Sequence, residues 1–173
     1  YELNLKCTVI AYGQENAEIV FKKNSLVTIE NCTLQIKNIR MKTSDRSEIR
    51  NSALVTVKNG TLELNACEFI SNFEKNGMLF KLDGASVKLK DTVLFGNAKD
   101  YLSMFNGADS TVVVEASRMN TVCDTAVCFS LRDSSLDLIS SEFKLTGNMG
   151  RVCELKNSKS FTTVLKKIGS FNF

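Results

Sequence analysis

Six cysteines and the absence of histidine limit the chemistry open to this chain of 173 residues. Histidine is the commonest general base at neutral pH and the commonest side-chain ligand of metals, so both roles lack their usual residue. No Cys-x-x-Cys pair occurs, which argues against a zinc site. The sequence therefore predicts no catalytic residues, no metal site and no cofactor.

Four of the cysteines fall at equivalent positions of a sequence repeat, as two neighbouring pairs. Cys32 is equivalent to Cys67, and Cys128 to Cys153. If the repeats stack as strands ~4.8 Å apart, the Cα atoms of each pair come within disulfide range, although parallel stacking is not the usual geometry. Two interpretations stay open: stacks of small buried thiols, which we favour, and disulfides between neighbouring repeats.

Aspartates recur at the turns of successive repeats, at positions 83, 109 and 133. Stacked on one edge, these carboxylates could bind a cation. Asparagine takes the same place in other repeats, at positions 24, 59 and 157, and Asx residues suit turns for backbone reasons alone. We interpret the three aspartates as turn residues rather than a site.

A basic stretch within residues 37–50 interrupts the repeat. It contains the possible partner-binding residues Lys37, Arg40, Lys42, Arg46 and Arg50. Insertions in solenoids form loops on one face, often the binding face, so we predict a loop insertion around 37–50 that could contact a partner. A solvated loop without a partner is the simpler alternative.

The repeat itself is visible as a column of apolar anchors. These are Leu3, Val27, Leu62, Val87, Val112, Leu136 and Phe161, with spacings of 24, 35, 25, 25, 24 and 25 residues. The residues two and seven positions after each anchor are almost all apolar, and the residue five positions after is small in six of the seven repeats. This alternation is typical of short strands with one buried face, bounded by Asn, Asp, Gly and Ser turns.

The fold class that fits is all-β: a single-stranded, right-handed parallel β-helix of about seven rungs, each of roughly 25 residues. The helical period is absent, and the right hand follows from the preference for right-handed parallel crossovers. Proline would remove a ladder hydrogen bond from a central strand, and the chain contains none. We predict a single domain over 1–173, and its strand-like ends predict a segment of a longer protein.

Composition excludes some partners. The net charge is +3, with basic and acidic residues interspersed, so no basic face for nucleic acid is expected. No apolar run reaches the roughly 20 residues of a membrane span, so no direct span is expected in this segment.

Several rungs end in an aromatic or aliphatic residue followed by asparagine, as in Phe69-Ile-Ser-Asn72 and Leu94-Phe-Gly-Asn97, and Asn76-Gly77 opens the next rung. This order resembles the Phe-x-x-Asn and Gly-Gly-Ala-Ile repeats of polymorphic outer-membrane proteins and related surface β-helices, within the pectin-lyase-like superfold. The resemblance covers most of the chain, but no intact Gly-Gly-Ala-Ile occurs. It implies an extracellular or cell-surface location and an adhesion or scaffold role.

The expected function is therefore a non-enzymatic extracellular or cell-surface module that serves as a structural scaffold or adhesion segment, with a protein or surface glycan as partner. The alternative is a carbohydrate-active β-helix, lyase-like or hydrolase-like, whose catalytic groove is degenerate or missing. End-to-end self-association is a third possibility, because uncapped solenoid ends present unpaired strands.

Overall fold

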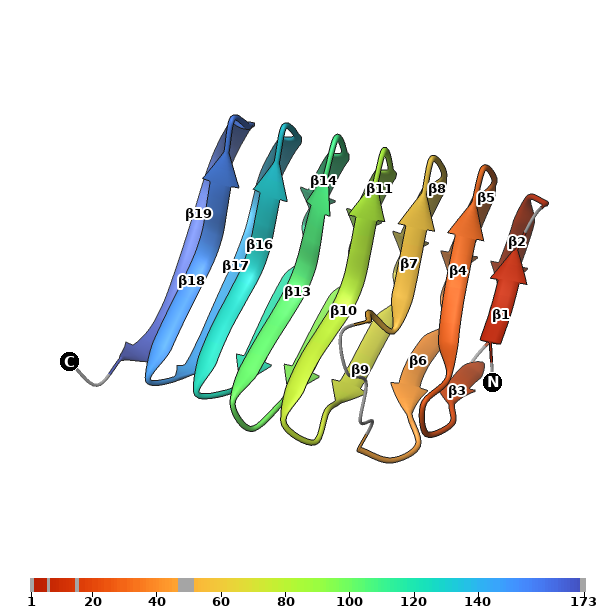
Figure 1. Ribbon diagram of the computed structural model, residues 1–173, viewed down its shortest axis with the longest axis horizontal. Helices are drawn as coiled ribbons and strands as arrows, with labels where there is room; N and C mark the ends of the chain where they lie inside the picture. Colours follow the sequence, from red (N-terminus) through yellow and green to blue (C-terminus); the bar gives the residue numbers. More distant parts are fainter. Residues whose placement is uncertain (1, 6, 15, 47–51, 172–173) are drawn as a thin grey trace.

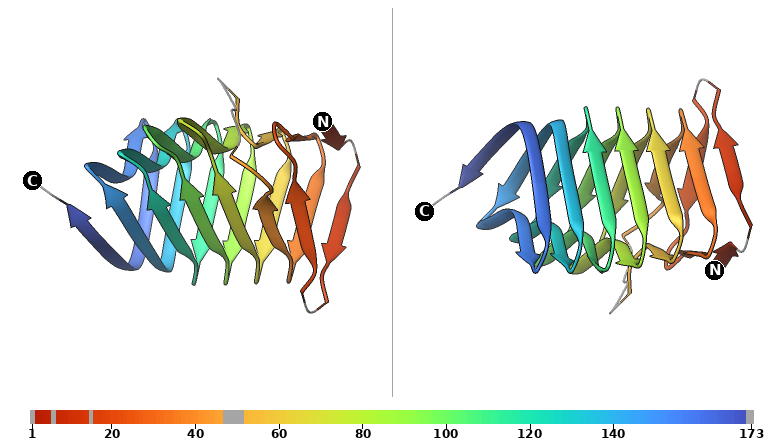
Figure 2. Two further views of the ribbon diagram at one scale, coloured as in Figure 1. Left: turned by 90° about the horizontal axis from the view of Figure 1, so that it is seen from below. Right: turned by 90° about the horizontal axis from the view of Figure 1, so that it is seen from above.

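The computed structural model describes residues 2–5, 7–14, 16–46 and 52–171, with side chains up to position 163. These residues form 19 strands and no helix. The strands pair in parallel and wind into a β-solenoid of about six turns, with β1 at one end and β19 at the other (Figures 1 and 2). The predicted fold class is confirmed, and its right hand stays a prediction.

Each turn of the solenoid contributes a strand to each of three faces. Sheet A forms one face and contains β1 (Glu2–Leu5), β4 (Leu26–Glu30), β7 (Val55–Lys58), β10 (Asn76–Asp83), β13 (Tyr101–Ala108), β16 (Thr125–Arg132) and β18 (Met149–Lys156). The first face of sheet B contains β2 (Val9–Tyr12), β5 (Thr33–Lys37), β8 (Thr61–Asn65), β11 (Ser86–Lys90) and β14 (Thr111–Glu115). Its second face contains β3 (Glu18–Phe21), β6 (Arg40–Thr43), β9 (Glu68–Asn72), β12 (Val93–Asn97) and β15 (Arg118–Val122). The long strands β17 (Ser135–Gly147) and β19 (Lys159–Phe171) run through both faces of sheet B.

The central anchors of the repeat stack as the sequence predicts. Leu62, Val87, Val112 and Leu136 follow one another in register through sheet B, and all four are buried. Alternate residues of these strands point inward, so each anchor and the residue two positions later add to the apolar core.

The first two anchors were placed in the wrong sheet. Leu3 pairs with Val27, and Val27 pairs with Val55, so all three lie in sheet A. The residue that pairs with Leu62 is Leu34, 28 positions earlier. The strands that contain Val27 and Leu34 have the same apolar alternation, seven residues apart. Taking Val27 in place of Leu34 as the partner of Leu62 lengthened this repeat from 28 to 35 residues. The extra length over a 25-residue repeat therefore looked like ten residues when it is three. The last anchor is one position off, because Phe161 pairs with Asp137.

Both corners that flank the first face of sheet B need a residue with positive φ. At the corner after sheet A these are Asn31, Asn59, Gly84, Asp109, Asp133 and Asn157. At the corner between the two faces of sheet B they are Asn38, Ala66, Asp91, Ala116 and Ser140. Glycine, asparagine and aspartate adopt this region most readily, so the Asx residues of the turns have a backbone role.

Alanine at the second corner stores backbone strain. Ala116 is exposed and has a φ of 47°. Because glycine has no Cβ to clash in this region, we expect Ala116→Gly to raise the free energy of unfolding by about 1 kcal/mol. Urea unfolding would measure the change. Asp91→Gly, at the equivalent position one turn earlier, should gain less, and an equal gain would argue against relief of strain at Ala116.

A ladder of hydroxyl groups runs inside each of these corners. At the first corner the backbone N–H of Ala85 donates to Ser110 Oγ (3.0 Å), that of Ser110 to Ser134 Oγ (3.0 Å) and that of Ser134 to Ser158 Oγ (3.1 Å). At the second corner Thr92, Ser117 and Ser141 accept in the same way. Each hydroxyl satisfies a buried donor that the corner has removed from the strand ladder, which explains the column of small residues in the sequence.

Removing one hydroxyl should leave a buried donor without a partner. We expect Ser110→Ala to lower the free energy of unfolding by roughly 2 kcal/mol, because the Ala85 N–H loses its acceptor in a dry corner. Ser135→Ala is the matched control, since in the described part of the chain the Ser135 hydroxyl bonds Thr111 Oγ1 alone, at an exposed site. Similar losses for both variants in urea unfolding would contradict the ladder's role.

The core is a stack of phenylalanine rings between the faces. The rings of Phe80, Phe105 and Phe129 stack along sheet A at centroid distances of 4.7 and 5.2 Å. Phe69 and Phe143 meet the two ends of this stack edge-on. Every one of these rings is at most 1% exposed, so the aromatic ladder fills the central turns.

Candidate functional site

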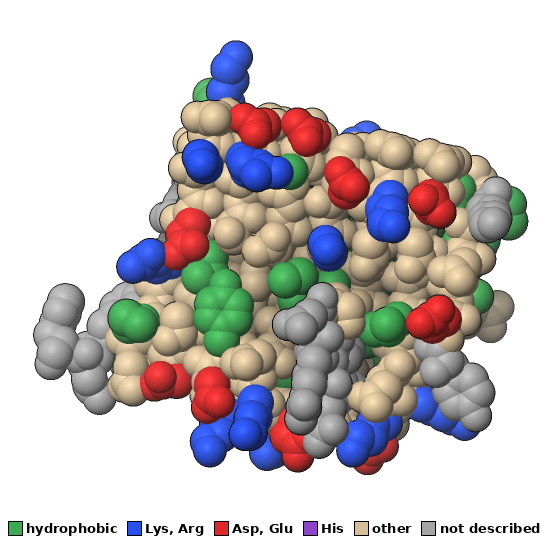
Figure 3. Space-filling model, viewed as in Figure 1, with side chains coloured by type: hydrophobic (Ala, Val, Ile, Leu, Met, Phe, Trp, Pro, Cys, Tyr) green, Lys and Arg blue, Asp and Glu red, His purple; other side chains and the backbone are tan. Residues whose placement is uncertain are grey.

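A groove crosses the outer face of sheet A over β10, β13, β16 and β18. It has a volume of about 810 Å³. The short side chains of Asn106, Ala108 and Ser130 form its floor. The charged residues of its rim are Lys81, Asp83, Arg132, Arg151, Glu154 and Lys156. Figure 3 shows this face, with basic and acidic side chains around a floor that has neither.

Strand register places these residues. Outward positions stack as two columns, Lys81–Asn106–Ser130–Glu154 and Asp83–Ala108–Arg132–Lys156. In the first column the long side chains of Lys81 and Glu154 flank the shorter Asn106 and Ser130, and in the second column Ala108 is the shortest side chain. The groove therefore follows from side-chain length on a regular sheet.

Gly107 keeps β13 close to β10 beneath the groove. A Cβ at this position would lie 2.5 Å from the Cβ of Leu82 and 2.7 Å from its carbonyl oxygen. Real Cβ atoms do not approach backbone and Cβ atoms so closely, so only glycine fits without a shift of the strand.

The charges of the rim are partly paired. Arg151 Nη1 lies 2.6 Å from Glu154 Oε1, and Arg132 Nε lies 3.5 Å from Asp133 Oδ2. Within the described part of the chain, Lys81 and Lys156 form no ion pair, and the side chains of Asn106 and Ser130 form no hydrogen bond. Four basic side chains against two acidic ones leave the groove positive.

Tyr101 lies on the outer face of β13, outside the lining of the groove but close enough to Glu154 to be affected by its charge. Its ring is 36% exposed. Burial raises the pKa of its phenol, the negative charge of Glu154 adds to the rise, and a hydrogen bond with Ser103 opposes it. The ring is therefore a half-open apolar surface next to the charged rim.

The predicted basic loop does not exist as one loop. Lys37 ends β5, and Arg40 and Lys42 lie in β6, where Arg40 Nε is 2.9 Å from Glu68 Oε2 and Lys42 Nζ is 2.7 Å from Glu18 Oε2. Arg46 is exposed in the connection between β6 and β7, and Arg50 lies outside the described residues. The loop placement is wrong for the three strand residues, because the shifted repeat placed the insertion too early, while partner binding by these residues stays a prediction.

The predicted cysteine columns are also wrong. Cys32 lies at the first corner, where its carbonyl accepts the N–H of Thr61, while Cys67 lies at the second corner, where its N–H donates to Thr92 Oγ1. Their thiols take the places of hydroxyls in the two corner ladders: Cys67 Sγ donates to the carbonyl of Asn65 two residues earlier, as Thr92 Oγ1 does to Lys90.

Cys128 and Cys153 are neighbours but not in one column. Cys153 pairs with Phe129, because paired residues of β16 and β18 are 24 positions apart in the sequence, whereas the two cysteines are 25 apart. Both thiols are free. Burial raises the pKa of Cys128 to about 12, with a smaller contribution from Cys153, and raises that of Cys153 to about 11. Such thiols stay protonated at neutral pH and are weak nucleophiles.

The three aspartates that the sequence assigns to turns lie at one corner of successive solenoid turns. Asp109 and Asp133 have positive φ and turn the chain, and Asp83 precedes the turn residue Gly84. Among the described residues, no group of three or more Cys, Asp or Glu side chains is placed to hold a metal ion.

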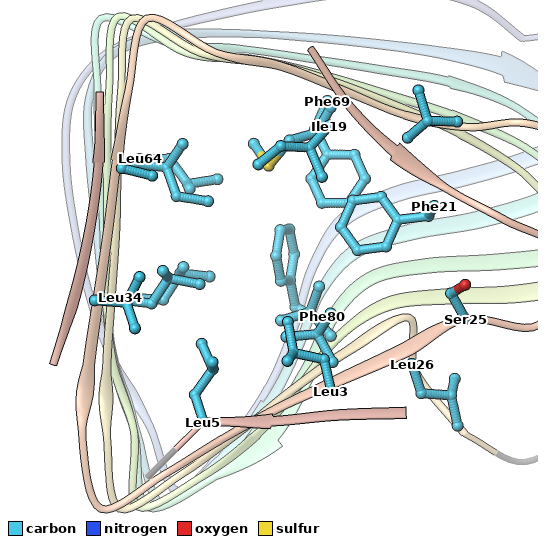
Figure 4. Close-up of a pocket in the computed structure, with 18 of the residues that line it drawn as sticks. Leu3, Leu5, Ile19, Phe21, Ser25, Leu26, Leu34, Leu64, Phe69 and Phe80 are labelled. Carbon is cyan, nitrogen blue, oxygen red and sulfur yellow. The ribbon is translucent and has the colours of Figure 1, made fainter. Parts of the chain in front are cut away.

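An apolar cavity of about 350 Å³ opens at the β1 end of the solenoid. Figure 4 shows Leu3, Leu5, Ile19 and Phe21 of the first turn around this cavity, together with Phe80 of β10. Strands β1, β2 and β3 each pair on one side only, so the cavity is the exposed cross-section of the core.

Sequence reasoning missed the groove residues. Of the residues considered from the sequence, only Asp83 lines the groove, and its pattern assigns it to a turn; the groove lies on the strand before that turn. A signal is present in the sequence: the third and first residues before the positive-φ corner position are Lys81 and Asp83 in β10, and Glu154 and Lys156 in β18.

The part of the chain that the structure describes contains no helix long and apolar enough to cross a membrane. No protein-family model, curated protein or solved structure matches the chain. Any functional proposal for the chain therefore rests on the β-solenoid fold and on the chemistry of the sheet A groove.

Proposed function

We propose that the chain is a non-enzymatic module of the extracellular space or cell surface, which serves as a rigid scaffold and binds a partner through the sheet A groove. The finer likeness to adhesin-type repeats of the pectin-lyase-like superfold is part of this proposal. Continuous hydrogen-bonded ladders over about six turns favour the scaffold role, because each turn is held by its neighbours.

The spacing of the groove carboxylates is the observation that favours binding over catalysis. Asp83 lies on β10 and Glu154 on β18, three strand spacings apart, or roughly 14 Å between backbones. The carboxyl groups that hydrolyse glycosides lie about 5–10 Å apart, so Asp83 and Glu154 would have to extend toward each other across the groove to act as such a pair. Glu154 is also ion-paired with Arg151. This pair does not fit glycoside hydrolysis.

Two measurements test the proposal. Intact cells of the source organism would be labelled with a membrane-impermeant biotin reagent, and the protein should be labelled to the same extent before and after lysis. Purified chain would be incubated with polyuronate, with and without Ca²⁺, and reducing ends and unsaturated products followed. Labelling only after lysis would contradict the location, and sustained turnover above a heat-treated control would favour the carbohydrate-active alternative.

A further inference from the structure

We infer that the ligand of the sheet A groove is a linear anionic glycan, one with carboxylate or sulfate groups spaced along a chain of hydroxyl-bearing sugars. The inference rests on the proposed function and names the class of partner. A groove of about 810 Å³ is within the size range of sites that enclose a ligand larger than a single ion.

The free cations lie too far apart for one small anion. Lys81 is on β10 and Lys156 is on β18, about 14 Å apart across the strands, and neither has an ion-pair partner within the described residues. Arg132 lies between them on β16, and among the described residues its one ion pair is the long 3.5 Å contact with Asp133. A ligand that satisfies all three cations must have several negative groups along its length.

The middle of the groove suits neutral polar groups of a ligand. Asn106 and Ser130 are adjacent in register, half-buried, and without a side-chain hydrogen bond among the described residues. An amide and a hydroxyl can both donate and accept, which suits sugar hydroxyls and ring oxygens. Tyr101, on the same face but outside the groove lining, is 36% exposed and offers an apolar surface for a sugar that extends beyond the groove.

An acidic peptide fits less well. Extended peptides bind sheets mainly by adding a strand at an open edge. The groove lies on the face of sheet A, where the backbone groups of β10, β13 and β16 are paired with strands on both sides. A peptide here would leave its own backbone groups without strand partners, whereas a glycan has no such requirement.

Calorimetric titration of the full chain would test the inference. The probes are a uronate-only hexamer, a sulfated glycosaminoglycan hexasaccharide, a neutral glucose hexamer, inorganic sulfate and a hexaglutamate peptide. We expect one or both anionic hexasaccharides to bind, the neutral hexamer and sulfate to bind at least tenfold more weakly, and affinity to fall as salt rises. The two anionic probes distinguish carboxylate from sulfate as the charged group.

Variants locate the site. Lys81→Gln and Lys156→Gln should each weaken binding about fivefold, and the double variant about 25-fold, because the two residues are too far apart to couple. Lys144→Gln is the matched control: Lys144 is an exposed lysine of β17 on another face, without an ion pair in the described part of the chain, and it should bind as the unaltered chain does. Circular dichroism would establish that all variants keep the fold.

Three outcomes would overturn the inference. These are binding that Lys81→Gln and Lys156→Gln leave unchanged, binding of hexaglutamate as tight as that of the glycans, and no binding of either anionic hexasaccharide. Surface labelling in intact cells and absence of turnover would still support the proposed function in each case, so the two can fail separately.

Discussion

Replacement of Phe105 by alanine is expected to lower the free energy of unfolding by about 4 kcal/mol. Phe105 is fully buried and stacks between Phe80 and Phe129 at centroid distances of 4.7 and 5.2 Å. The change removes a large buried apolar surface and two ring contacts. The cavity that remains lies between turns fixed by parallel ladders, so the structure has little freedom to close it.

Urea unfolding gives the size of the loss, and hydrogen exchange gives its place. In a solenoid each turn contacts mainly its neighbours, so amides of β10, β13 and β16 should lose protection before those of distant turns. Phe95→Ala is the matched control, because Phe95 is a half-buried ring on β12 outside the stack, and we expect a loss of about 1 kcal/mol. Equal losses for the two variants would mean that the stack contributes nothing beyond ordinary burial.

The central turns were predictable because their pattern allows one register. Leu62, Val87, Val112 and Leu136 recur with nearly constant spacing, and a slip of one residue would turn each of these side chains out of the core. The small-residue column was visible for a similar reason: a hydroxyl must stand at each corner to accept a buried N–H. Fold class and core therefore follow from local patterns repeated many times.

The first turns were not predictable in the same way, because two faces have the same local pattern. The segments around Val27 and Leu34 both alternate apolar residues before a positive-φ asparagine, Asn31 and Asn38. If the repeat is assigned to the neighbouring strand, its apolar side chains still point inward, so no local sequence pattern reveals the error. Only pairing with the following turn distinguishes them, and this pairing is a long-range property.

The candidate site does not stand out in the sequence, because it is defined by residues about 25 positions apart on one outer face. Outward positions face solvent, and burial does not fix their type. Lys81, Asn106 and Ser130 become neighbours only once the register of sheet A is known. In contrast, Arg40 and Lys42 attract attention as a basic run, and the structure pairs each with a glutamate on a neighbouring strand.

Alkaline pH should destabilise the fold through the Cys128 thiol, by roughly 3 kcal/mol at pH 11. Cys128 is fully buried, and burial raises its pKa from the ordinary value of 9.0 to about 12. Between these two values the unfolded chain has lost the thiol proton while the folded chain keeps it. The folded state therefore binds more protons, and the free energy of unfolding falls as pH rises. The contribution is fully present below pH 9 and is lost between pH 9 and pH 12.

The measurement is the free energy of unfolding in urea at pH 8 and pH 11, with a reductant present, for the unaltered chain and for Cys128→Ala. Lysine and tyrosine titrate in the same range, but they do so in both proteins, so the difference between the two pH-dependent losses isolates the thiol. Cys128→Ala should start less stable, because it leaves a small cavity, and should then lose roughly 3 kcal/mol less on going to pH 11. Cys7→Ala, at an exposed cysteine, should follow the unaltered chain. If the losses of the unaltered chain and of Cys128→Ala are the same, ionisation of Cys128 is not coupled to unfolding, and the thiol must lie in a wetter environment than a fully buried core position provides.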